Sequence, residues 1–349
     1  MPSSKTECTE LSVGFGLLGL DPIGASREYI LSAWASSLSP GKLLDYLAEY
    51  SRDEVYYRRF FEVGVNLRRS YGVFARANVN SVRWEGPHHQ ARSVSMAKDL
   101  VAANIPISVK ANSNVVFNHS PYVLFTSVPS GVSAPTRSDN WFLVVAPQSY
   151  QELYTWMRSQ SSENLPTQVD DYHRTVRGDR KKQLGRLVKQ LTEAQTSHFE
   201  ALYLRLSHDV AEESADRFNA AIQSSFSGPI KNAVAEDIIK TLFRLGDSEY
   251  VLCGLDHNNG FGVDVPDITS WKRQWVLRSV VAQPDLSRGQ SIVDINLVIE
   301  NKQTRQRYPI AFEVQIRWAH GKFSGNPEAK VYKKFRWIAV PFFNRVFGE

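Results

Sequence analysis

The spacing of apolar residues changes from a helical period to a strand period along the chain. Over residues 26–70 the apolar positions recur at helical spacing, with breaks at Ser39-Pro40-Gly41 and before Asp53. We therefore predict two helices within 26–51 and a third over 53–67. Residues 1–22 hold a short apolar patch among glycines, and we predict a tail that leads into a Gly-rich loop.

Between residues 87 and 245, segments with the helical period of apolar residues alternate with segments that have the strand period. We predict a helix over 87–100, and residues 99–103 are either its end or a short strand. A turn at Asn104 and a strand over 105–109 would complete a hairpin. Further apolar runs predict strands over 122–128 and 141–146, separated by a loop over 128–140, and a helix over 150–158. Residues 159–182 are polar and without period, and helices are predicted over 184–206, 210–222 and 230–245.

From residue 250 onward the pattern is that of β-strands. Strands are predicted over 250–255, 261–266, 275–282, 291–300 and 308–318, with turns marked by glycine, asparagine and proline. The fold class is therefore mixed α/β, in the α+β sense. We expect an N-terminal helical segment over 1–80, a core of helix, hairpin, strand and helix over 81–158, a helical insertion over 159–246 and a β-rich region over 247–349. These parts are alternatively one compact domain.

Four polar side chains are expected to meet at one edge of the hairpin. Glu85 precedes the predicted helix, Asp99 follows it, and Ser108 and Lys110 lie at the end of the second strand. Cutting a phosphodiester requires a divalent cation held by carboxylates, an activated water and a positive group near the phosphate. Asp99 and Glu85 are candidate Mg²⁺ ligands, and Lys110 is the candidate group that positions the water and offsets transition-state charge. A solvated helix-end acid and strand-end lysine are the competing interpretation.

The spacing Asp99, Ser108-Val-Lys110 resembles the PD-(D/E)xK nuclease motif, with Ser108 in the usual acidic position. The run Ser108 to Ser113 and the later Asn118-His-Ser-Pro are similar to what type II restriction endonucleases carry after their catalytic lysine. The resemblance implies a mixed-sheet nuclease core and Mg²⁺-dependent cleavage of double-stranded DNA at specific sequences, leaving 5′-phosphates. It further implies a homodimer and a cognate DNA methyltransferase in the same cell. Because Ser108 cannot replace a carboxylate, Glu85 or a backbone carbonyl would complete the metal site.

Polar residues in two segments are candidate DNA contacts. Strand alternation over 308–318 puts Glu313, Gln315 and Arg317 on one face and apolar residues on the other. Arginine and lysine read guanine, and asparagine and glutamine read adenine, so planar polar groups beside a strand fit base readout. A salt-bridged surface hairpin is the alternative. The candidate DNA-binding residues are Asn112, Ser113, Asn114, Asn118, Gln315, Arg317, His320, Lys322, Asn326 and Lys330.

The same C-terminal region offers a rival active centre. Asp294 followed by Glu313-Val-Gln315 resembles a variant of the nuclease motif in which Gln315 stands in for the lysine. Glu313-Val-Gln-Ile-Arg317 also resembles a strand of (p)ppGpp synthetases, which implies a nucleotide-handling enzyme, although no basic helix with an acidic ligand precedes it. A non-catalytic DNA-binding protein that uses the same surfaces is a further alternative.

Composition narrows the class of protein. The 349 residues are 42% hydrophobic and 22% charged, which is enough for a sizeable core, and the net charge of +5 suits a polyanionic partner. Basic residues cluster around 58–69 and 174–182, as phosphate contacts or as solvated helix faces. The two cysteines, Cys8 and Cys253, indicate no disulfide framework, which favours a reducing, cytoplasmic compartment. The N-terminus lacks the basic region of a signal peptide, and no uncharged run reaches membrane-spanning length.

Overall fold

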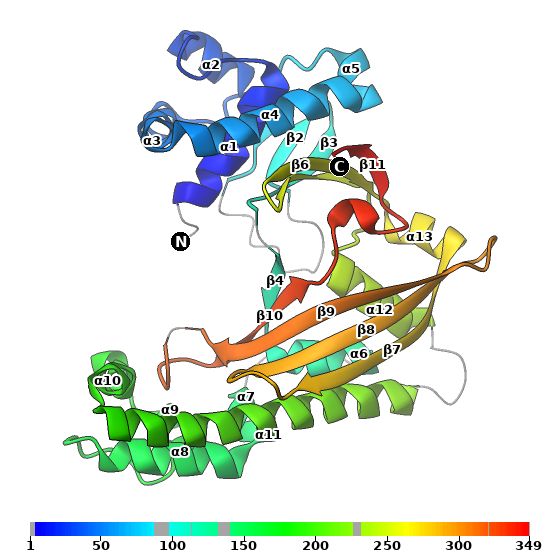
Figure 1. Cartoon of the computed structure of the whole chain (residues 1–349). Helices are drawn as coiled ribbons and strands as arrows, with labels where there is room; N and C mark the ends of the chain where they lie inside the picture. The colour runs from blue at the N-terminus through cyan, green and yellow to red at the C-terminus, as the bar shows by residue number, and fades with distance from the viewer. Residues whose placement is uncertain are drawn as a thin grey trace.

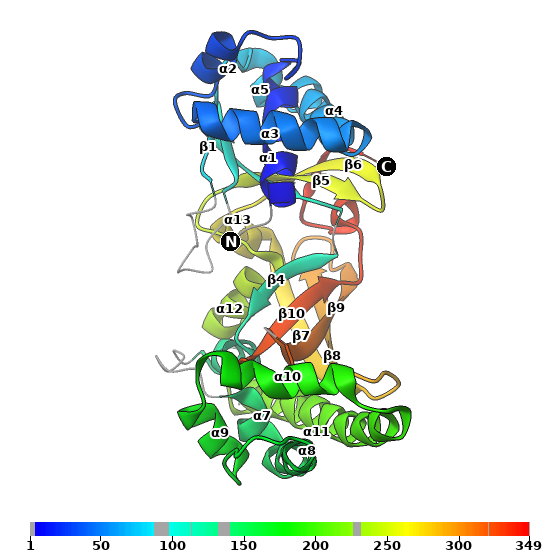
Figure 2. The ribbon, with the colours of Figure 1, turned by 90° about the vertical axis from the view of Figure 1, so that its left-hand side faces the viewer.

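A computed structural model of the chain describes residues 4–86, 98–112, 114–131, 140–225, 232–319 and 321–348. Two β-sheets lie one above the other along the long axis of the molecule (Figure 1). Helices of the N-terminal part cover the outer side of one sheet, and a long helix covers the outer side of the other. A view from the side shows the two halves joined at a narrow middle (Figure 2). The chain is thus of mixed α+β class, as predicted.

The N-terminal half consists of helices packed around an aromatic-rich core. They are α1 (Ser4–Leu18), α2 (Arg27–Ala33), α3 (Pro40–Arg52), α4 (Glu54–Ser70) and α5 (Gly72–Ala77). The prediction of two helices within 26–51 and one over 53–67 is confirmed. Ser39 and Asp53 cap α3 and α4, because each side chain accepts a hydrogen bond from a backbone N–H of the first turn.

The prediction of an N-terminal tail is wrong, because residues 4–18 form the helix α1. The glycines of α1 allow another helix to pack closely against it, and they do not form a loop. A Cβ at Gly16 would lie 2.0 Å from the carbonyl oxygen of Phe61, and one at Gly64 would lie 2.1 Å from that of Val13. Helices α1 and α4 therefore cross with their backbones in contact, which only glycine permits at these positions.

The first sheet combines strands from distant parts of the sequence. Among the described residues its order is β1-β2-β3-β5-β6-β11. The strands are β1 (Val82–Trp84), β2 (Leu100–Ala102), β3 (Ile105–Lys110), β5 (Tyr250–Asp256), β6 (Asn259–Val265) and β11 (Asn344–Phe347). Strands β3 and β5 run parallel and the other neighbours run antiparallel. The predicted hairpin is confirmed: Ala103 and Asn104 have positive φ angles of 46° and 64°, as a two-residue turn of type I′ requires.

The predicted helix over 87–100 does not extend to its end. Residues 87–97 lie outside the described residues, Asp99 is extended, and Leu100 begins β2. Of the two interpretations of residues 99–103, the short strand is confirmed. Leu100 faces Ile107 across the hairpin, and both side chains are fully buried, so core packing decides the conformation of this segment.

Two other predicted strands are helical. Residues 123–127 form the π-helix η1 (Val123–Ser127), which continues into α6 (Val128–Ser130), and residues 141–145 form α7 (Trp141–Val145). In the second case Asn140 caps the helix by accepting a hydrogen bond from the N–H of Phe142 at 3.1 Å. Short apolar runs do not distinguish a buried strand from a buried helix, which explains both errors.

The remaining helices are α8 (Pro147–Ser159), α9 (Val169–Thr175), η2 (Gly178–Lys182), α10 (Gln183–Leu187), η3 (Val188–Gln190), α11 (Glu193–Ser225), α12 (Asn232–Phe243), α13 (Ile268–Gln274) and η4 (Trp337–Ala339). Most of them lie around the second sheet, whereas η4 packs on β6 of the first. The prediction for 150–158 is confirmed. The two helices predicted over 184–206 and 210–222 are largely one, α11, and the polar segment 159–182 contains α9 and η2. No helix among the described residues is both long and apolar enough to cross a membrane.

The second sheet is antiparallel and has one buried face. Its order within the described residues is β4-β10-β9-β8-β7. The strands are β4 (Val115–His119), β7 (Trp275–Asp285), β8 (Ser291–Asn301), β9 (Arg307–Trp318) and β10 (Pro327–Lys333). Phe312, Val314 and Ile316 are buried, and Gln315 and Arg317 on the other face are partly exposed, as predicted. Glu313 belongs to that second face but is buried. The segment boundaries 1–80, 81–158, 159–246 and 247–349 stay a prediction, and the first sheet draws strands from both sides of them.

A buried ion pair joins the two sheets. Asp256 ends β5 in the first sheet, and Lys333 ends β10 in the second. The Lys333 Nζ lies 2.9 Å from Asp256 Oδ1, and the side chains are 1% and 4% exposed. The other carboxylate oxygen of Asp256 accepts a hydrogen bond from the N–H of Trp337. Because an unpaired buried charge is costly, this pair fixes the two sheets relative to each other.

We predict that Lys333→Met lowers the free energy of unfolding by about 3–5 kcal/mol, because it leaves Asp256 buried without its cation. Arg205→Met, which breaks an exposed pair with Glu152, serves as the control and should cost less than about 1 kcal/mol. Urea unfolding of both variants measures the difference. Equal losses would show that the buried pair does not hold the sheets together.

Candidate functional site

Three of the predicted residues lie in one row across the first sheet. The N–H of Glu85 donates to the carbonyl of Asp99, and the N–H of Asp99 donates to the carbonyl of Ile107. The register of the three strands therefore puts Glu85, Asp99 and Ser108 opposite one another. Residues opposite one another in a ladder point to the same face. Lys110, two residues beyond Ser108, points to that face as well.

The carboxylate of Asp99 is held by the neighbouring strand β3. Its Oδ2 accepts a hydrogen bond from the N–H of Val109 at 2.6 Å and one from the hydroxyl of Ser108 at 3.2 Å. Ser108 thus orients the carboxylate and does not take the place of a second acid. Burial raises the pKa of Asp99, against the effect of Val109 N–H, Lys110 and Arg244. The site residue is therefore fixed in position, in surroundings that disfavour an isolated negative charge.

Lys110 shares the face of Asp99 and, like it, is only partly exposed. Its Nζ lies 3.3 Å from the carbonyl oxygen of Val116, at the start of β4. Burial lowers the pKa of Lys110 to about 7, with a further contribution from the charge of Arg244, while Asp99 acts in the opposite direction. A lysine with this pKa exchanges a proton readily near neutral pH, which is the property of a general base or acid.

The backbone of Glu85 pairs with Asp99, but its carboxylate binds another residue. The side chain forms an ion pair with Arg83, with 2.7 Å between nitrogen and oxygen. The backbone of Glu85 extends the ladder to Asp99, as described above. Glu85 therefore adjoins the site, and a cation at Asp99 would compete with Arg83 for its carboxylate.

The structure adds an acid that the sequence did not indicate. Glu10 lies in α1, where its Oε2 accepts a hydrogen bond from the indole N–H of Trp84 at 2.8 Å. Burial raises the pKa of Glu10 to about 8, and the negative charge of Asp99 contributes. Because residues 1–22 were interpreted as a tail, no acid there was considered. The available signal was Glu7 and Glu10, one helical turn apart, directly before an apolar run.

The donor set suits a divalent cation. Asp99 and Glu10 are two partly buried carboxylates, and the negative charge of Asp99 helps to raise the pKa of Glu10. Hard oxygen donors of this kind bind Mg²⁺, which usually keeps several waters and takes further oxygens from a substrate phosphate. The described residues contain no group of three or more histidine, cysteine, aspartate and glutamate side chains placed to hold a metal. Asp99 would contribute one carboxylate to such a site, and Glu10 is the acid on which the charge of Asp99 acts.

The rival centre is a network of paired charges on the second sheet. Asp294 and Glu313 lie opposite each other in β8 and β9. The Lys334 Nζ lies 2.7 Å from both oxygens of Asp294, and a guanidinium nitrogen of Arg288 lies 3.0 Å from Glu313. The amide of Gln315 donates to Glu313 at 2.8 Å. Both carboxylates are thus in direct contact with cations of the chain itself.

Part of the predicted DNA-binding set forms one surface. Lys330 lies opposite Asn118 on one side and opposite Gln315 on the other, so the three side chains form a row on one face of the second sheet. Arg317 lies two residues beyond Gln315 and pairs with Glu328 at 3.6 Å. We name Asn118, Gln315, Arg317 and Lys330 the polar sheet face.

Other members of the predicted set have structural contacts. Asn112 and Asn258 exchange two hydrogen bonds, of 2.9 and 3.0 Å, and the carbonyl of Asn114 accepts from the N–H of Lys333. The Lys322 Nζ lies over the rings of Phe199 and Tyr203, 4.2 and 4.7 Å from their centres. Asn326 directly precedes β10, and Ser113 and His320 lie outside the described residues.

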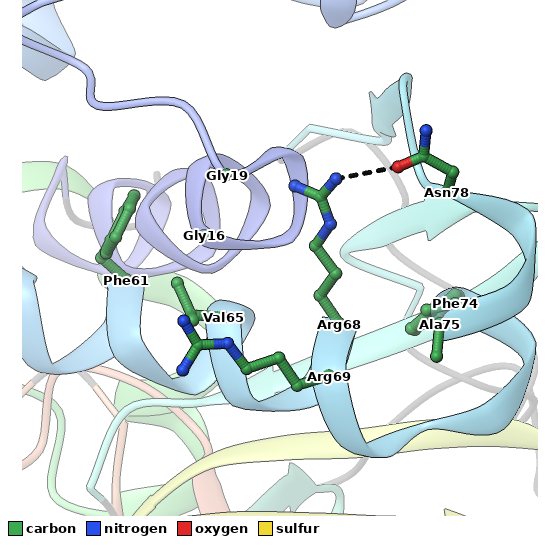
Figure 3. Close-up of a pocket in the computed structure, with 9 residues that line it drawn as sticks. All are labelled: Gly16, Gly19, Phe61, Val65, Arg68, Arg69, Phe74, Ala75 and Asn78. Atoms are coloured by element: carbon green, nitrogen blue, oxygen red, sulfur yellow. Dashed lines mark hydrogen bonds between the residues drawn. The ribbon is translucent and has the colours of Figure 1, made fainter.

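A separate hollow lies between α1, α4 and α5 (Figure 3). Arg68 and Arg69 line it together with Phe61 and Phe74. Arg68 donates to the carbonyl of Leu18 at 2.7 Å and to the side chain of Asn78 at 3.1 Å. It thereby satisfies the C-terminal end of α1, which is a structural role.

We predict that Glu10→Gln stabilises the protein increasingly as the pH rises from 5 to 8. In the unfolded chain the carboxyl ionises near its ordinary pKa of 4.5, whereas the folded protein keeps it protonated up to about 8. Stability is therefore lost across this window in the parent and not in the variant, whose amide oxygen still accepts from Trp84. Each tenfold difference in proton affinity corresponds to about 1.4 kcal/mol, so a gain of several kcal/mol is the upper bound.

Urea unfolding at several pH values measures this gain. Glu152→Gln, at a partly exposed carboxyl on α8, is the matched control and should change stability equally at pH 5 and pH 8. A pH-independent effect of Glu10→Gln would contradict the buried, repelled state of this acid.

Comparison of the chain with protein families, with curated proteins and with solved structures finds no match.

Proposed function

We propose that the chain is a Mg²⁺-dependent endonuclease that cuts double-stranded DNA at specific sequences, in the manner of a type II restriction enzyme. The observation that carries the proposal is the position of Asp99 and Lys110. Asp99 directly precedes β2 and Lys110 ends the neighbouring strand β3. Both residues face the same side of the sheet, and the charge of each affects the pKa of the other. The mixed first sheet, with β3 and β5 parallel, is of the kind that the resemblance to the PD-(D/E)xK nucleases implies.

The residues of the site have distinct roles in this proposal. Asp99 and Glu10 would hold Mg²⁺, and Ser108 and the N–H of Val109 keep the Asp99 carboxylate in position. When bound, the cation polarises the phosphate and stabilises negative charge that develops during the reaction. Glu10 must lose its proton to act as a ligand, so cation binding and deprotonation are coupled.

Lys110 acts on the attacking water. With a pKa of about 7, a large fraction of Lys110 is neutral at neutral pH, and the neutral amine accepts a proton as the water attacks phosphorus. A new P–O bond forms, the bond to the 3′ oxygen breaks, and that oxygen leaves with a proton from solvent. The products are a 5′-phosphate and a 3′-hydroxyl, and no oxidant or reductant is needed.

Sequence recognition is assigned to the polar sheet face. Amide and guanidinium groups in a row along a strand match the hydrogen-bonding edges of adenine and guanine in the major groove. Two copies of the chain would cut the two strands of a symmetric site, and protection of the host DNA would require a methyltransferase in the same cell. These last two proposals rest on the resemblance alone.

We predict that the purified chain converts supercoiled plasmid to nicked and linear forms with Mg²⁺ and not with a chelator. Lys110→Ala should slow cleavage on the order of a thousandfold, because the group that accepts the proton and offsets charge is removed. Binding of Lys110→Ala to duplex DNA, measured by gel shift, should stay within a few-fold of the parent.

Two lysine variants serve as matched controls. Lys322→Ala removes an ammonium group that packs over aromatic rings, and it should cut at the parental rate. Lys330→Ala should weaken binding without lowering the turnover of saturated enzyme. Cleavage by Lys110→Ala at the parental rate would refute the assignment, and a parent that shifts DNA without nicking it would be a non-catalytic DNA-binding protein.

A further inference from the structure

Three arginines converge on one buried acid at an end of the second sheet. Glu300, next to the last residue of β8, is 3% exposed. Its Oε1 lies 2.5 Å from Nη2 of Arg278 and 3.4 Å from Nη1 of Arg305, and its Oε2 lies 3.0 Å from Nε of Arg307. We name Arg278, Arg305 and Arg307 the arginine cluster. The carboxylate holds the three cations together, although they repel one another.

The arginine cluster carries more positive charge than Glu300 neutralises. One carboxylate faces three guanidiniums, and the loop after β8 adds Lys302, whose ammonium donates to the backbone carbonyl of Lys272. The side chains of the cluster are 42%, 73% and 69% exposed, in chain order. Because a guanidinium has several N–H groups on three nitrogens, each arginine contacts Glu300 and still presents N–H groups to solvent. Such an excess of exposed positive charge attracts a polyanion.

The arginine cluster lies on the same side of the sheet as the polar sheet face. Strand β9, which crosses the second sheet in Figure 1, pairs with β8 without a bulge, and Arg307 lies opposite Glu300 in this pairing. Side chains at even spacing along a strand point to the same face, so Arg307 points to the side of Gln315 and Arg317. Arg307 and Arg317 lie ten residues apart on β9, which at about 3.3 Å per residue is about 33 Å. One turn of B-DNA has nearly this length, about 34–36 Å.

We propose that the arginine cluster binds the phosphate backbone of the DNA duplex, about one helical turn away from the bases that the polar sheet face reads. This inference rests on the proposed function and adds to it a contact that is independent of base sequence. Guanidinium groups match the geometry of phosphate oxygens and stay charged at all relevant pH values. Phosphate contacts fix the position of a protein on DNA and carry no base information. The duplex would thus lie along β9, with base readout at one end of the strand and the arginine cluster at the other.

Binding of the full chain to duplex DNA at several salt concentrations, in a chelator so that no cleavage occurs, tests the proposal. A double variant, Arg305→Gln with Arg307→Gln, removes two cations and leaves Arg278 as the partner of Glu300. It should lower the slope of log affinity against log salt by about two, because each lost phosphate contact releases about one counterion fewer. The affinity should fall by the same factor for long duplexes of unrelated sequence. In Mg²⁺ the kcat of the saturated double variant should equal that of the parent, because the cluster takes no part in the chemical step. Arg305→Gln alone should lower the slope by about one.

Two further double variants separate phosphate contact from net charge and from structure. Arg27→Gln with Arg52→Gln changes the net charge equally at exposed positions of α2 and α3, and it should keep the parental slope. Arg305→Lys with Arg307→Lys keeps both charges and should also keep that slope.

A parental slope in the glutamine double variant would overturn the inference, and the proposed function would stand if the parent cuts plasmid DNA. Loss of slope in the control on α2 and α3 would mark an effect of overall charge, and loss in the lysine variant would mark a structural role. Either result would also overturn the inference. A parent that binds no DNA removes the proposed function and the inference together.

Discussion

The burial of ionisable side chains on the first sheet and at its junction with the second is the constraint on which the rest of this structure depends. In a low-dielectric interior each charge needs a partner of opposite sign or gives up its charge. Asp256 and Lys333 meet this requirement as a pair at 2.9 Å, and they join the sheets. Glu10 and Lys110 meet it differently, because burial and like charges shift their pKa values towards neutrality, to about 8 and about 7. Asp256 and Lys333 neutralise each other. Glu10 and Lys110 would each be neutralised by a bound ion of opposite charge, a metal cation and a phosphate anion.

This difference separates the candidate site from the other charged clusters. Asp294 and Glu313 resemble a nuclease centre in sequence, but Lys334 and Arg288 already neutralise them. Glu300 is likewise surrounded by arginines, which lower the pKa of its carboxyl to about 2. In both clusters the chain supplies its own counter-charges on the second sheet. At the candidate site the pKa of Glu10 is raised and the pKa of Lys110 is lowered. A bound metal would lower the pKa of Glu10 again, and a bound phosphate would raise that of Lys110.

The sequence predicted the parts of the fold in which local signals and packing agree. The hairpin turn at Asn104 and the alternation around Gln315 follow from turn chemistry and strand period, and both are confirmed. Helix α1 was missed because its glycines resemble a loop until the contact with α4 explains them. The spacing of Asp99 and Lys110 in one hairpin predicted that they share a face of the sheet, whereas Glu10 comes from helix α1, far from Asp99 in the sequence. No local pattern encodes such long-range contacts, and only the packing of helices on the sheet brings them together.

The most direct test of the central claim is the binding of Mg²⁺ to the purified chain by titration calorimetry at pH 7, in two buffers that differ in ionisation enthalpy. The account predicts saturable binding that releases up to about one proton per chain, because Glu10 gives up its proton to become a ligand. Glu10→Gln should bind more weakly and without this release. Absence of Mg²⁺ binding, or binding with equal proton release in Glu10→Gln, would contradict the account.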